Sequence, residues 1–225
     1  MPKITGAVLM HDHEGSGASE LPAAYPGALE VDVHLRNGTT ALFRPIRPTD
    51  GTALVAFHDG LSPRSVYRRF FFVHPHLSVA EVERFTHVDY CDRMAFIVLD
   101  DELIVGVGRY ERLGGTSEAE AAFVVTDDHQ HLGIGTLLLD CLADVGRDHG
   151  IDRFVAQTMS ENKDMLGVFL GSGFPVETTS EGGTVTLRFP IALDDDYRRA
   201  RASRRTSVVP PDRSGATASE SSPGK

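Results

Sequence analysis

The fold is decided by the stretch QHLGIGT, residues 130–136, which lies between a short apolar run and a long amphipathic segment. Residues 121–125 before it read AAFVV, a β-type run, and Leu138, Leu142 and Val145 after it recur at helical spacing. This order predicts a strand, a glycine-containing turn and the start of a helix. Because the first N–H groups of a helix lack partners within it and lie at the positive end of its dipole, such a turn is suited to binding phosphate oxygens.

Two common phosphate-binding loops do not fit this stretch. A Walker loop requires Gly-Lys-Ser/Thr, whereas Gly135 is followed directly by Thr136. A dinucleotide-binding fingerprint requires a third glycine, and Leu138 stands at that place. A glycine-rich turn that only packs, without a ligand, stays open as the alternative.

The remaining pattern, Gln-x-x-Gly-x-Gly at a strand-to-helix turn, resembles the acyl-CoA pyrophosphate loop of the GCN5-related N-acetyltransferase (GNAT) superfamily. A second strand, expected over residues 154–158, is followed by Asn162 and by the pair Gly173-Phe174. These residues resemble the closing element of that superfamily, in which an asparagine at the start of a helix contacts the pantetheine arm. Gly173 also suits an ordinary helix stop. The resemblance implies an α/β (α+β) GNAT fold, with a central, mixed, mostly antiparallel sheet of about seven strands flanked by about four to five helices.

Strand and helix patterns along the chain follow the order of this fold. An Asn37-Gly38 turn predicts a hairpin near the start, and a Ser-x-x-Glu pattern predicts a capped helix from Ser78. We expect strands over residues 31–36, 39–46, 94–99, 103–111, 118–125 and 153–158, with two more flanking residues 181–183. Helices are expected from Pro48 through residue 58, over residues 62–72, 78–86 and 163–170, and from the glycine turn to about residue 150.

One domain with two flanking segments accounts for the composition. We expect residues 1–30 to be a flexible leader, residues 31–192 to form the GNAT domain, and residues 193–225 to be a disordered Arg/Ser/Pro-rich tail. The formal net charge is −10 and the tail is basic, so the rest of the chain is strongly acidic. A basic tail can contact nucleic acid or the acidic surface of its own domain. The acidic body argues against a module that reads nucleic acid and favours a cationic acceptor.

Composition also bears on the cell compartment and on metals. The chain has no apolar run of the ~20 residues that a membrane helix needs, and its start lacks a signal-type apolar region. We therefore expect a cytoplasmic protein without membrane association. Cys91 and Cys141 are the only cysteines, and no disulfide is expected. His11 and His13 lack further fixed ligands nearby, so no resident metal is expected.

Acyl transfer to an amine sets a definite requirement, because an ammonium has no lone pair and must lose a proton before it attacks a thioester. Glu120, just before the 121–125 run, stands in a position resembling the general-base glutamate of many GNAT enzymes. Glu118 would point to the same face of the sheet and is the rival if the strand contains a bulge. A solvated carboxylate at a strand end is the alternative without a catalytic role.

The resemblance also implies which residues contact acetyl-CoA as the cosubstrate. Strand amides would polarise the thioester carbonyl, the loop would hold the pyrophosphate, and Asn162, at the start of the 163–170 helix, would contact the pantetheine region. The residues implied are Phe123, Val124, Val125, Gln130, His131, Leu132, Gly133, Ile134, Gly135, Thr136, Asn162 and Phe169. Phe169 stands where many relatives have a tyrosine that protonates the departing thiolate. His131 and Leu132 replace a common glycine and arginine, which weakens the expected contact with the phosphates.

The first third of the chain narrows the resemblance to a subgroup. Residues 61–71, LSPRSVYRRFF, and residues 86–90, THVDY, resemble the GNAT domain of bacterial protein lysine acetyltransferases that modify acyl-CoA synthetases. This implies an acetyl-CoA-dependent N-acetyltransferase that acts on a protein lysine by direct attack in a ternary complex. An acyl-CoA synthetase is the candidate protein partner. A small-molecule amine acetyltransferase and a non-catalytic acyl-CoA-binding module stay open. Arg64, Arg68 and Arg69 would form the acceptor side or be surface charges, with Tyr67 and Phe70 in the core.

Overall fold

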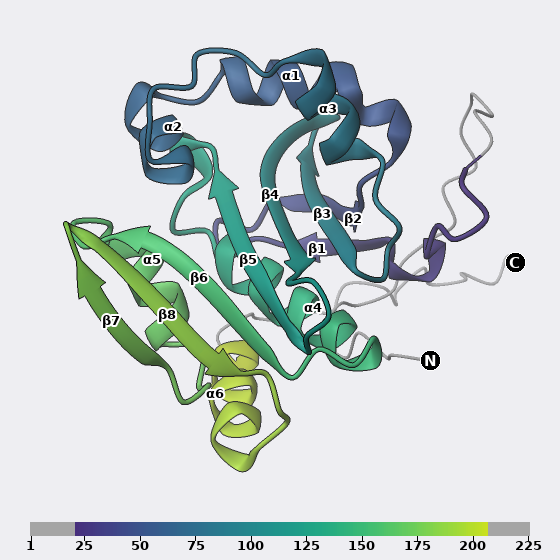
Figure 1. The fold of residues 1–225 in the computed structure, drawn as a ribbon. Helices are drawn as coiled ribbons and strands as arrows, with labels where there is room; N and C mark the ends of the chain where they lie inside the picture. The colour runs from purple at the N-terminus through teal and green to yellow at the C-terminus, as the bar shows by residue number, and fades with distance from the viewer. Residues whose placement is uncertain (1–20, 207–225) are drawn as a thin grey trace, which may run out of the picture.

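The computed structural model describes residues 21–206 of the 225-residue chain. Eight strands form one sheet in the order β1-β2-β3-β4-β5-β6-β8-β7 (Figure 1). The strands are Val31–His34 (β1), Thr40–Pro45 (β2), Arg93–Asp100 (β3), Leu103–Arg112 (β4), Glu118–Val125 (β5), Arg153–Met159 (β6), Glu177–Glu181 (β7) and Thr184–Pro190 (β8). The α-helices in this part of the chain are Gly51–Asp59 (α1), Pro63–Phe70 (α2), Val79–Thr86 (α3), Ile134–Asp148 (α4), Lys163–Leu170 (α5) and Asp195–Thr206 (α6). The predicted mixed, mostly antiparallel sheet is confirmed, with a strand at each of the eight expected segments and one helix, α6, beyond the five expected.

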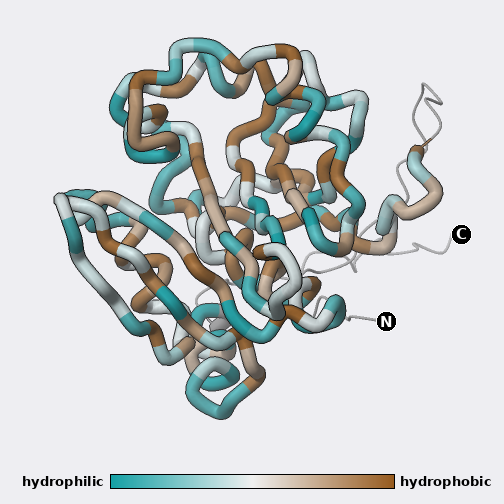
Figure 2. Tube along the Cα trace, in the orientation of Figure 1, coloured by the Kyte–Doolittle hydropathy of each residue, from teal (hydrophilic) through white to brown (hydrophobic). Residues whose placement is uncertain are grey.

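The middle of the sheet is buried on both faces, which explains why β3 reads as a continuous apolar run. Alternate residues of a strand point to opposite faces. Phe96 of β3 therefore belongs to the core that α4 covers, and its neighbour Ile97 belongs to the smaller core that α1 covers. Figure 2 shows hydrophobic residues following these central strands.

Local sequence signals place the helices. Leu138, Leu142 and Val145 of α4 are each at most 4% exposed, so the predicted apolar face is the one that packs on the sheet. Helix α3 begins with the predicted capping box. The Ser78 N–H donates to Glu81 Oε2 at 2.8 Å, and the Glu81 N–H donates to Ser78 Oγ at 3.3 Å.

One junction in the sheet differs from all the others. Strands β5 and β6 run parallel, joined through α4, whereas the other neighbouring strands are antiparallel. Their pairing covers only residues 118–120 against residues 153–155. Both strands continue beyond these pairs and diverge from each other (Figure 1). The divergence leaves an opening in the sheet between the ends of β5 and β6.

The prediction of a flexible leader over residues 1–30 is wrong for its described part, residues 21–30. Leu29 lies in a short 3-10 turn and is 5% exposed, against the core under β1. The Tyr25 hydroxyl accepts a hydrogen bond from Arg47 Nε at 3.1 Å, and Glu30 pairs with the same guanidinium. Composition did not reveal these contacts because the partner arginine lies beyond the segment. Residues 1–20, with His11 and His13, lie outside the described residues.

The prediction of a disordered tail over residues 193–225 is also wrong where the structure describes it. Residues 195–206 form α6, two of whose arginines pair with acidic residues of α4. Arg201 donates to both carboxylate oxygens of Asp144, at 2.8 and 2.6 Å, and Arg204 donates to both of Asp140, at 3.0 and 3.2 Å. The basic segment thus contacts the acidic surface of its own domain. Residues 207–225 lie outside the described residues.

Helix α6 is anchored by an aromatic residue as well as by charge. Tyr197 is fully buried, and its ring stacks on Phe174 with centroids 4.2 Å apart. Gly173 makes this approach possible, since a Cβ there would lie 2.6 Å from Ala200 Cβ and 3.0 Å from the Tyr197 Cα. Gly173 also has a φ of +90°, which favours glycine. Gly173 therefore both turns the backbone after α5 and allows α6 to pack closely against it.

No helix in residues 21–206 combines the length and apolar character that a membrane span requires.

We expect Tyr197→Ala to lower the free energy of unfolding by about 3 kcal/mol, because it removes a buried ring and leaves a cavity between α6 and Phe174. The measurement is urea unfolding followed by circular dichroism. Arg198→Ala is the control, since the Arg198 side chain on the same helix is 60% exposed and should change stability little. Equal unfolding midpoints for wild type and Tyr197→Ala would contradict the packing of α6.

Candidate active site

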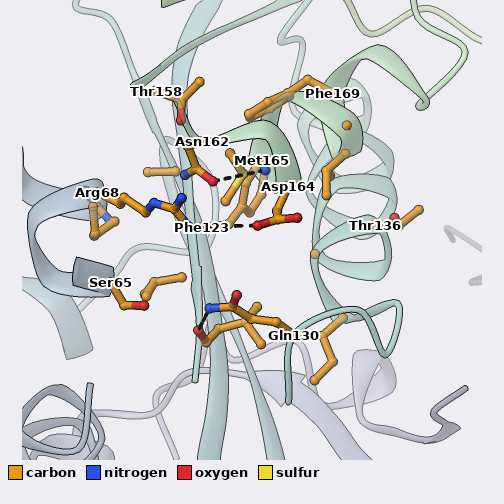
Figure 3. Close-up of a pocket in the computed structure, with 18 of the residues that line it drawn as sticks. Ser65, Arg68, Phe123, Gln130, Thr136, Thr158, Asn162, Asp164, Met165 and Phe169 are labelled. Atoms are coloured by element: carbon orange, nitrogen blue, oxygen red, sulfur yellow. Dashed lines mark hydrogen bonds and ion pairs between the residues drawn. The ribbon is translucent and has the colours of Figure 1, made fainter. Parts of the chain in front are cut away.

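A cavity of about 430 Å³ lies where β5 and β6 diverge (Figure 3). Its walls come from β5, the loop before α4, the first turn of α4, the end of β6, helix α5 and helix α2. Glu120 lines this cavity, together with eleven of the twelve residues predicted to contact the cofactor: Phe123, Val124, Val125, Gln130, His131, Gly133, Ile134, Gly135, Thr136, Asn162 and Phe169. Leu132 and Glu118 do not.

Backbone groups of β5 face the opening because the strand has lost its neighbour there. The Thr126 N–H donates to Val105 O at 2.9 Å, toward β4. Along an antiparallel pair the direction alternates, so the amide of Val124 also faces β4, while those of Phe123 and Val125 face the opening. Of the three amides that the sequence suggested, two are therefore free to meet a ligand, and Val124 contributes its side chain.

The glycine loop presents the end of α4 to the cavity. Gly133 is the N-cap residue with a φ of +92°, a conformation that favours glycine. The first bond of the helix runs from the Leu137 N–H to Gly133 O at 3.0 Å. The N–H groups of Ile134, Gly135 and Thr136 precede it and have no acceptor within the helix. Together with the helix dipole, these amides make the loop end of the cavity suitable for a phosphate.

Side chains on both sides of the loop hold it in place. The Gln130 amide donates to Val125 O at 3.3 Å, which covers one of the open carbonyl groups of β5. His129 bridges two elements, with Nδ1 3.0 Å from Thr126 Oγ1 and Nε2 3.1 Å from Asp100 Oδ2. Because both ring nitrogens are engaged, His129 acts as a brace on the cavity wall. Sequence reasoning did not identify it.

Leu132 departs from its predicted role as a cofactor contact. Its side chain packs against the main core, and its carbonyl accepts the Arg36 N–H at 3.2 Å. His131 before it has a left-handed φ of +64°, which turns the chain so that the two residues face different surroundings. His131 remains exposed at the cavity, where Nε2 lies 3.8 Å from Asp164 Oδ1.

Helix α5 supplies the wall opposite β5. Asn162 is buried as its N-cap residue, with Oδ1 accepting the Met165 N–H at 3.3 Å. Phe169 is 1% exposed, and its ring centroid lies 5.5 Å from that of Phe123 and 5.7 Å from that of Phe189. Phe169 shapes the floor of the opening and offers no proton, as its side chain predicts.

The two candidate bases lie in different surroundings. Glu120 is exposed on the cavity wall. Glu118 instead pairs with Arg153 at 3.2 Å and lies 3.8 Å from Arg188. The register between β4 and β5 runs without a shift from Gly106 opposite Val125 to Arg112 opposite Ala119, so the bulge that would favour Glu118 is not there. Of the two carboxylates, only Glu120 therefore lines the cavity.

Helix α2 brings two arginines to the cavity that the sequence left undecided. Arg68 and Arg69 line it, whereas Arg64 is exposed away from it. The Arg68 side chain is 11% exposed and reaches across the opening, with Nη1 3.9 Å from Asp164 Oδ2 (Figure 3). Burial lowers the pKa of Arg69, and the charge of nearby Glu120 opposes that shift. Tyr67 is 43% exposed, so its predicted place in the core is wrong.

The position of α2 relative to β5 is fixed by one carboxylate. Asp127 Oδ1 accepts hydrogen bonds from Ser62 Oγ and Ser65 Oγ, each at 3.0 Å. Burial alone would raise the pKa of Asp127, but the bonds from Ser65 and Ser62 lower it, so the carboxylate is charged at neutral pH.

Among the described residues, no group of three His, Cys, Asp or Glu side chains is arranged to hold a metal.

Comparisons with known proteins agree with this architecture. Residues 63–174 match the Acetyltransferase (GNAT) family. Acetyltransferase PA5475 of Pseudomonas aeruginosa is 31% identical over 182 residues, which cover 79% of this chain and 97% of that protein. Acetyltransferase Pat of Mycolicibacterium smegmatis is 30% identical over 138 residues, 60% of this chain and 41% of that protein.

A solved structure matches at the level of both sequence and fold. The GNAT domain of PAT from S. lividans is 39% identical, with a TM-score of 0.70 over 74% of this chain and 99% of that domain. Nearly the whole of that domain and of PA5475 is thus covered by this chain. The chain belongs to the GNAT family of acetyltransferases.

Proposed function

We propose that this protein is an acetyl-CoA-dependent N-acetyltransferase that acts on a protein lysine ε-amine in the cytoplasm. The observation that carries the proposal is the opening between β5 and β6, which joins the phosphate-binding end of α4 to Glu120 in one cavity. The amides of Ile134, Gly135 and Thr136 would bind the diphosphate. The opening would hold the pantetheine arm beside Asn162.

The reaction follows from the groups at the far end of the opening. The outward amides of Phe123 and Val125 would donate hydrogen bonds to the thioester carbonyl and to the oxyanion that forms from it. Glu120 would take a proton from the ammonium, directly or through water, and the neutral amine would then attack the carbonyl carbon. A C–N bond forms, the C–S bond breaks, and coenzyme A leaves as a thiolate, while the attacking nitrogen releases its remaining excess proton to solvent or to that thiolate. Because thiols have a pKa of about 8.5, the thiolate can leave without an acid at Phe169.

The choice of a protein lysine rests on three features. Glu120 lies exposed on the cavity, where a side chain of another protein could reach it. The acidic body of the chain favours a cationic acceptor. The sequence of α2 and its flanks resembles enzymes that modify acyl-CoA synthetases, and relatives named Pat share this fold. We therefore propose an acyl-CoA synthetase as a candidate protein substrate.

The loop assignment predicts that Gly135→Glu weakens acetyl-CoA binding about 100-fold or more, because it places a carboxylate beside the phosphates. Isothermal titration calorimetry measures the affinity. Gly135→Ala separates bulk from charge, since its methyl would lie 3.3 Å from Val168 Cγ2, a tight contact that a small shift of the valine side chain relieves, and should leave most of the affinity. Gly114→Glu is the control, because a Cβ at Gly114 lies in open space away from the cavity. Wild-type affinity in Gly135→Glu would rule out the loop as the phosphate site.

Glu120→Gln should lower kcat/KM for the amine by about 100-fold or more at neutral pH while acetyl-CoA binds as before, because the amide cannot accept the proton. Steady-state kinetics over a pH range measures the loss. Glu118→Gln is the matched variant, since Glu118 lies two residues earlier on the same strand, and it should keep most of the activity. If Glu120→Gln instead matched wild type at every pH, the base would have to be another group, and loss in Glu118→Gln alone would identify that residue.

Labelled acetyl-CoA should transfer its acetyl group to lysines of a purified acyl-CoA synthetase, with modified positions mapped by mass spectrometry. Free lysine, polyamines and aminoglycosides serve as the small-amine panel. Turnover confined to that panel would overturn the proposed acceptor class and leave the acetyltransferase assignment in place. Binding of acetyl-CoA without turnover of any amine would favour a non-catalytic acyl-CoA-binding module.

A further inference from the structure

The phosphate end of the cavity lacks a basic side chain from the glycine loop itself. Leu132 points into the core, and exposed His131 faces the carboxylate of Asp164 at 3.8 Å. The carboxylate of Asp164, which also faces Arg68 at 3.9 Å, thus occupies the surroundings of the loop's one imidazole side chain. The helix amides supply partial positive charge, and an arginine or lysine that adds a full charge here has to come from outside the loop.

Arg36 brings that charge from the turn between β1 and β2, far away in the sequence. The main-chain N–H of Arg36 donates to Leu132 O at 3.2 Å. Nη1 of its guanidinium donates to His131 O at 3.5 Å. A Cβ built on Gly133 would lie 3.5 Å from Arg36 Nε, so the guanidinium stem lies beside the N-cap residue of α4. Arg36 also lines the cavity. The main-chain bond places the residue beside the loop, and the Nη1 bond and the stem beside Gly133 place the guanidinium at the loop end of the cavity.

The turn that carries Arg36 is well held. The Gly38 N–H donates to Leu35 O at 2.9 Å, and Asn37 Oδ1 accepts from both the N–H and the hydroxyl of Thr39, at 3.1 and 2.8 Å. Leu35 is 5% exposed, which anchors the start of the turn in the core. The guanidinium is therefore carried by an ordered hairpin rather than by a free segment.

The charge of Arg36 is not neutralised in the described part of the chain. Its contacts there are with backbone carbonyl oxygens, and no Asp or Glu side chain pairs with it. This distinguishes it from Arg68, which faces Asp164, and from Arg201, which is paired with Asp144. A guanidinium with free donors beside three open helix amides is suited to a phosphate, since its planar fork matches two oxygens at once.

We propose that Arg36 is the phosphate-binding cation of this protein, supplied by the β1–β2 hairpin in place of a basic residue of the glycine loop. The guanidinium contacts a phosphate of coenzyme A from the side opposite α5 and so selects for the intact nucleotide cosubstrate over pantetheine thioesters. This inference rests on the proposed function, because it presupposes that a coenzyme A thioester occupies the cavity.

The test combines Arg36 variants with truncated ligands in isothermal titration calorimetry. Arg36→Ala should weaken acetyl-CoA binding about tenfold or more and leave the weak binding of acetyl-pantetheine unchanged. Arg36→Lys should recover part of the affinity, because it restores the charge but not the fork. The difference between wild type and Arg36→Ala should shrink at high salt. Arg64→Ala is the control, since Arg64 is an exposed arginine away from the cavity.

Acetyl-dephospho-CoA, which lacks the 3′-phosphate, identifies the phosphate that is bound. An equal loss with acetyl-CoA and acetyl-dephospho-CoA assigns Arg36 to the diphosphate, and a loss confined to acetyl-CoA assigns it to the 3′-phosphate. Wild-type affinity of Arg36→Ala for acetyl-CoA would overturn the inference, as would an equal loss for acetyl-pantetheine. Thermal unfolding of each variant verifies folding, with Arg36→Lys as the conservative check. Failure of the wild type to bind any coenzyme A ligand would instead refute the proposed function.

Discussion

The site depends on the end of backbone pairing between β5 and β6 after three residue pairs. Each strand remains fully paired on its other side, β5 with β4 through Val125 and β6 with β8 through Met159. The right-handed twist of a sheet turns neighbouring strands against each other, so two well-paired halves that share a short junction diverge beyond it. Phe169 fills the base of the gap, in contact with Phe123 of one half and Phe189 of the other. An apolar wedge thus keeps the two halves apart.

An opening of this kind exposes backbone groups that a closed sheet would satisfy. Unpaired N–H and C=O groups at an edge are costly when buried and attract a partner when accessible. The Gln130 side chain covers the carbonyl of Val125, and the amides of Phe123 and Val125 stay available. The same loop then ends in the free amides of α4. Donors for a carbonyl and for a phosphate are therefore arranged along one path, and both arise from main-chain geometry rather than from particular side chains.

Sequence reasoning succeeds where the signal is local. The bounds of β5 and α5 coincide with the predicted residues 118–125 and 163–170, because apolar periodicity and caps are encoded within each segment. Reasoning from the sequence misses what depends on distant partners. The tail looked disordered because the acids that pair with its arginines, Asp140 and Asp144, lie on another helix. The inward turn of Leu132 depends on one left-handed residue before it, a conformation that composition does not specify.

The distribution of charge gives the cavity a character opposite to that of the whole chain. The net charge is −10, and the arginines of α6 that the structure describes are largely committed to acidic partners on α4 and within α6 itself. Four positive side chains line the cavity. Arg36 comes from the β1–β2 turn before the family match, Arg68 and Arg69 come from α2 where the match begins, and Lys163 comes from α5. A local positive field in an acidic protein draws an anionic ligand to one place. The N-terminal hairpin and α2 therefore complete a site whose main-chain donors come from β5 and α4.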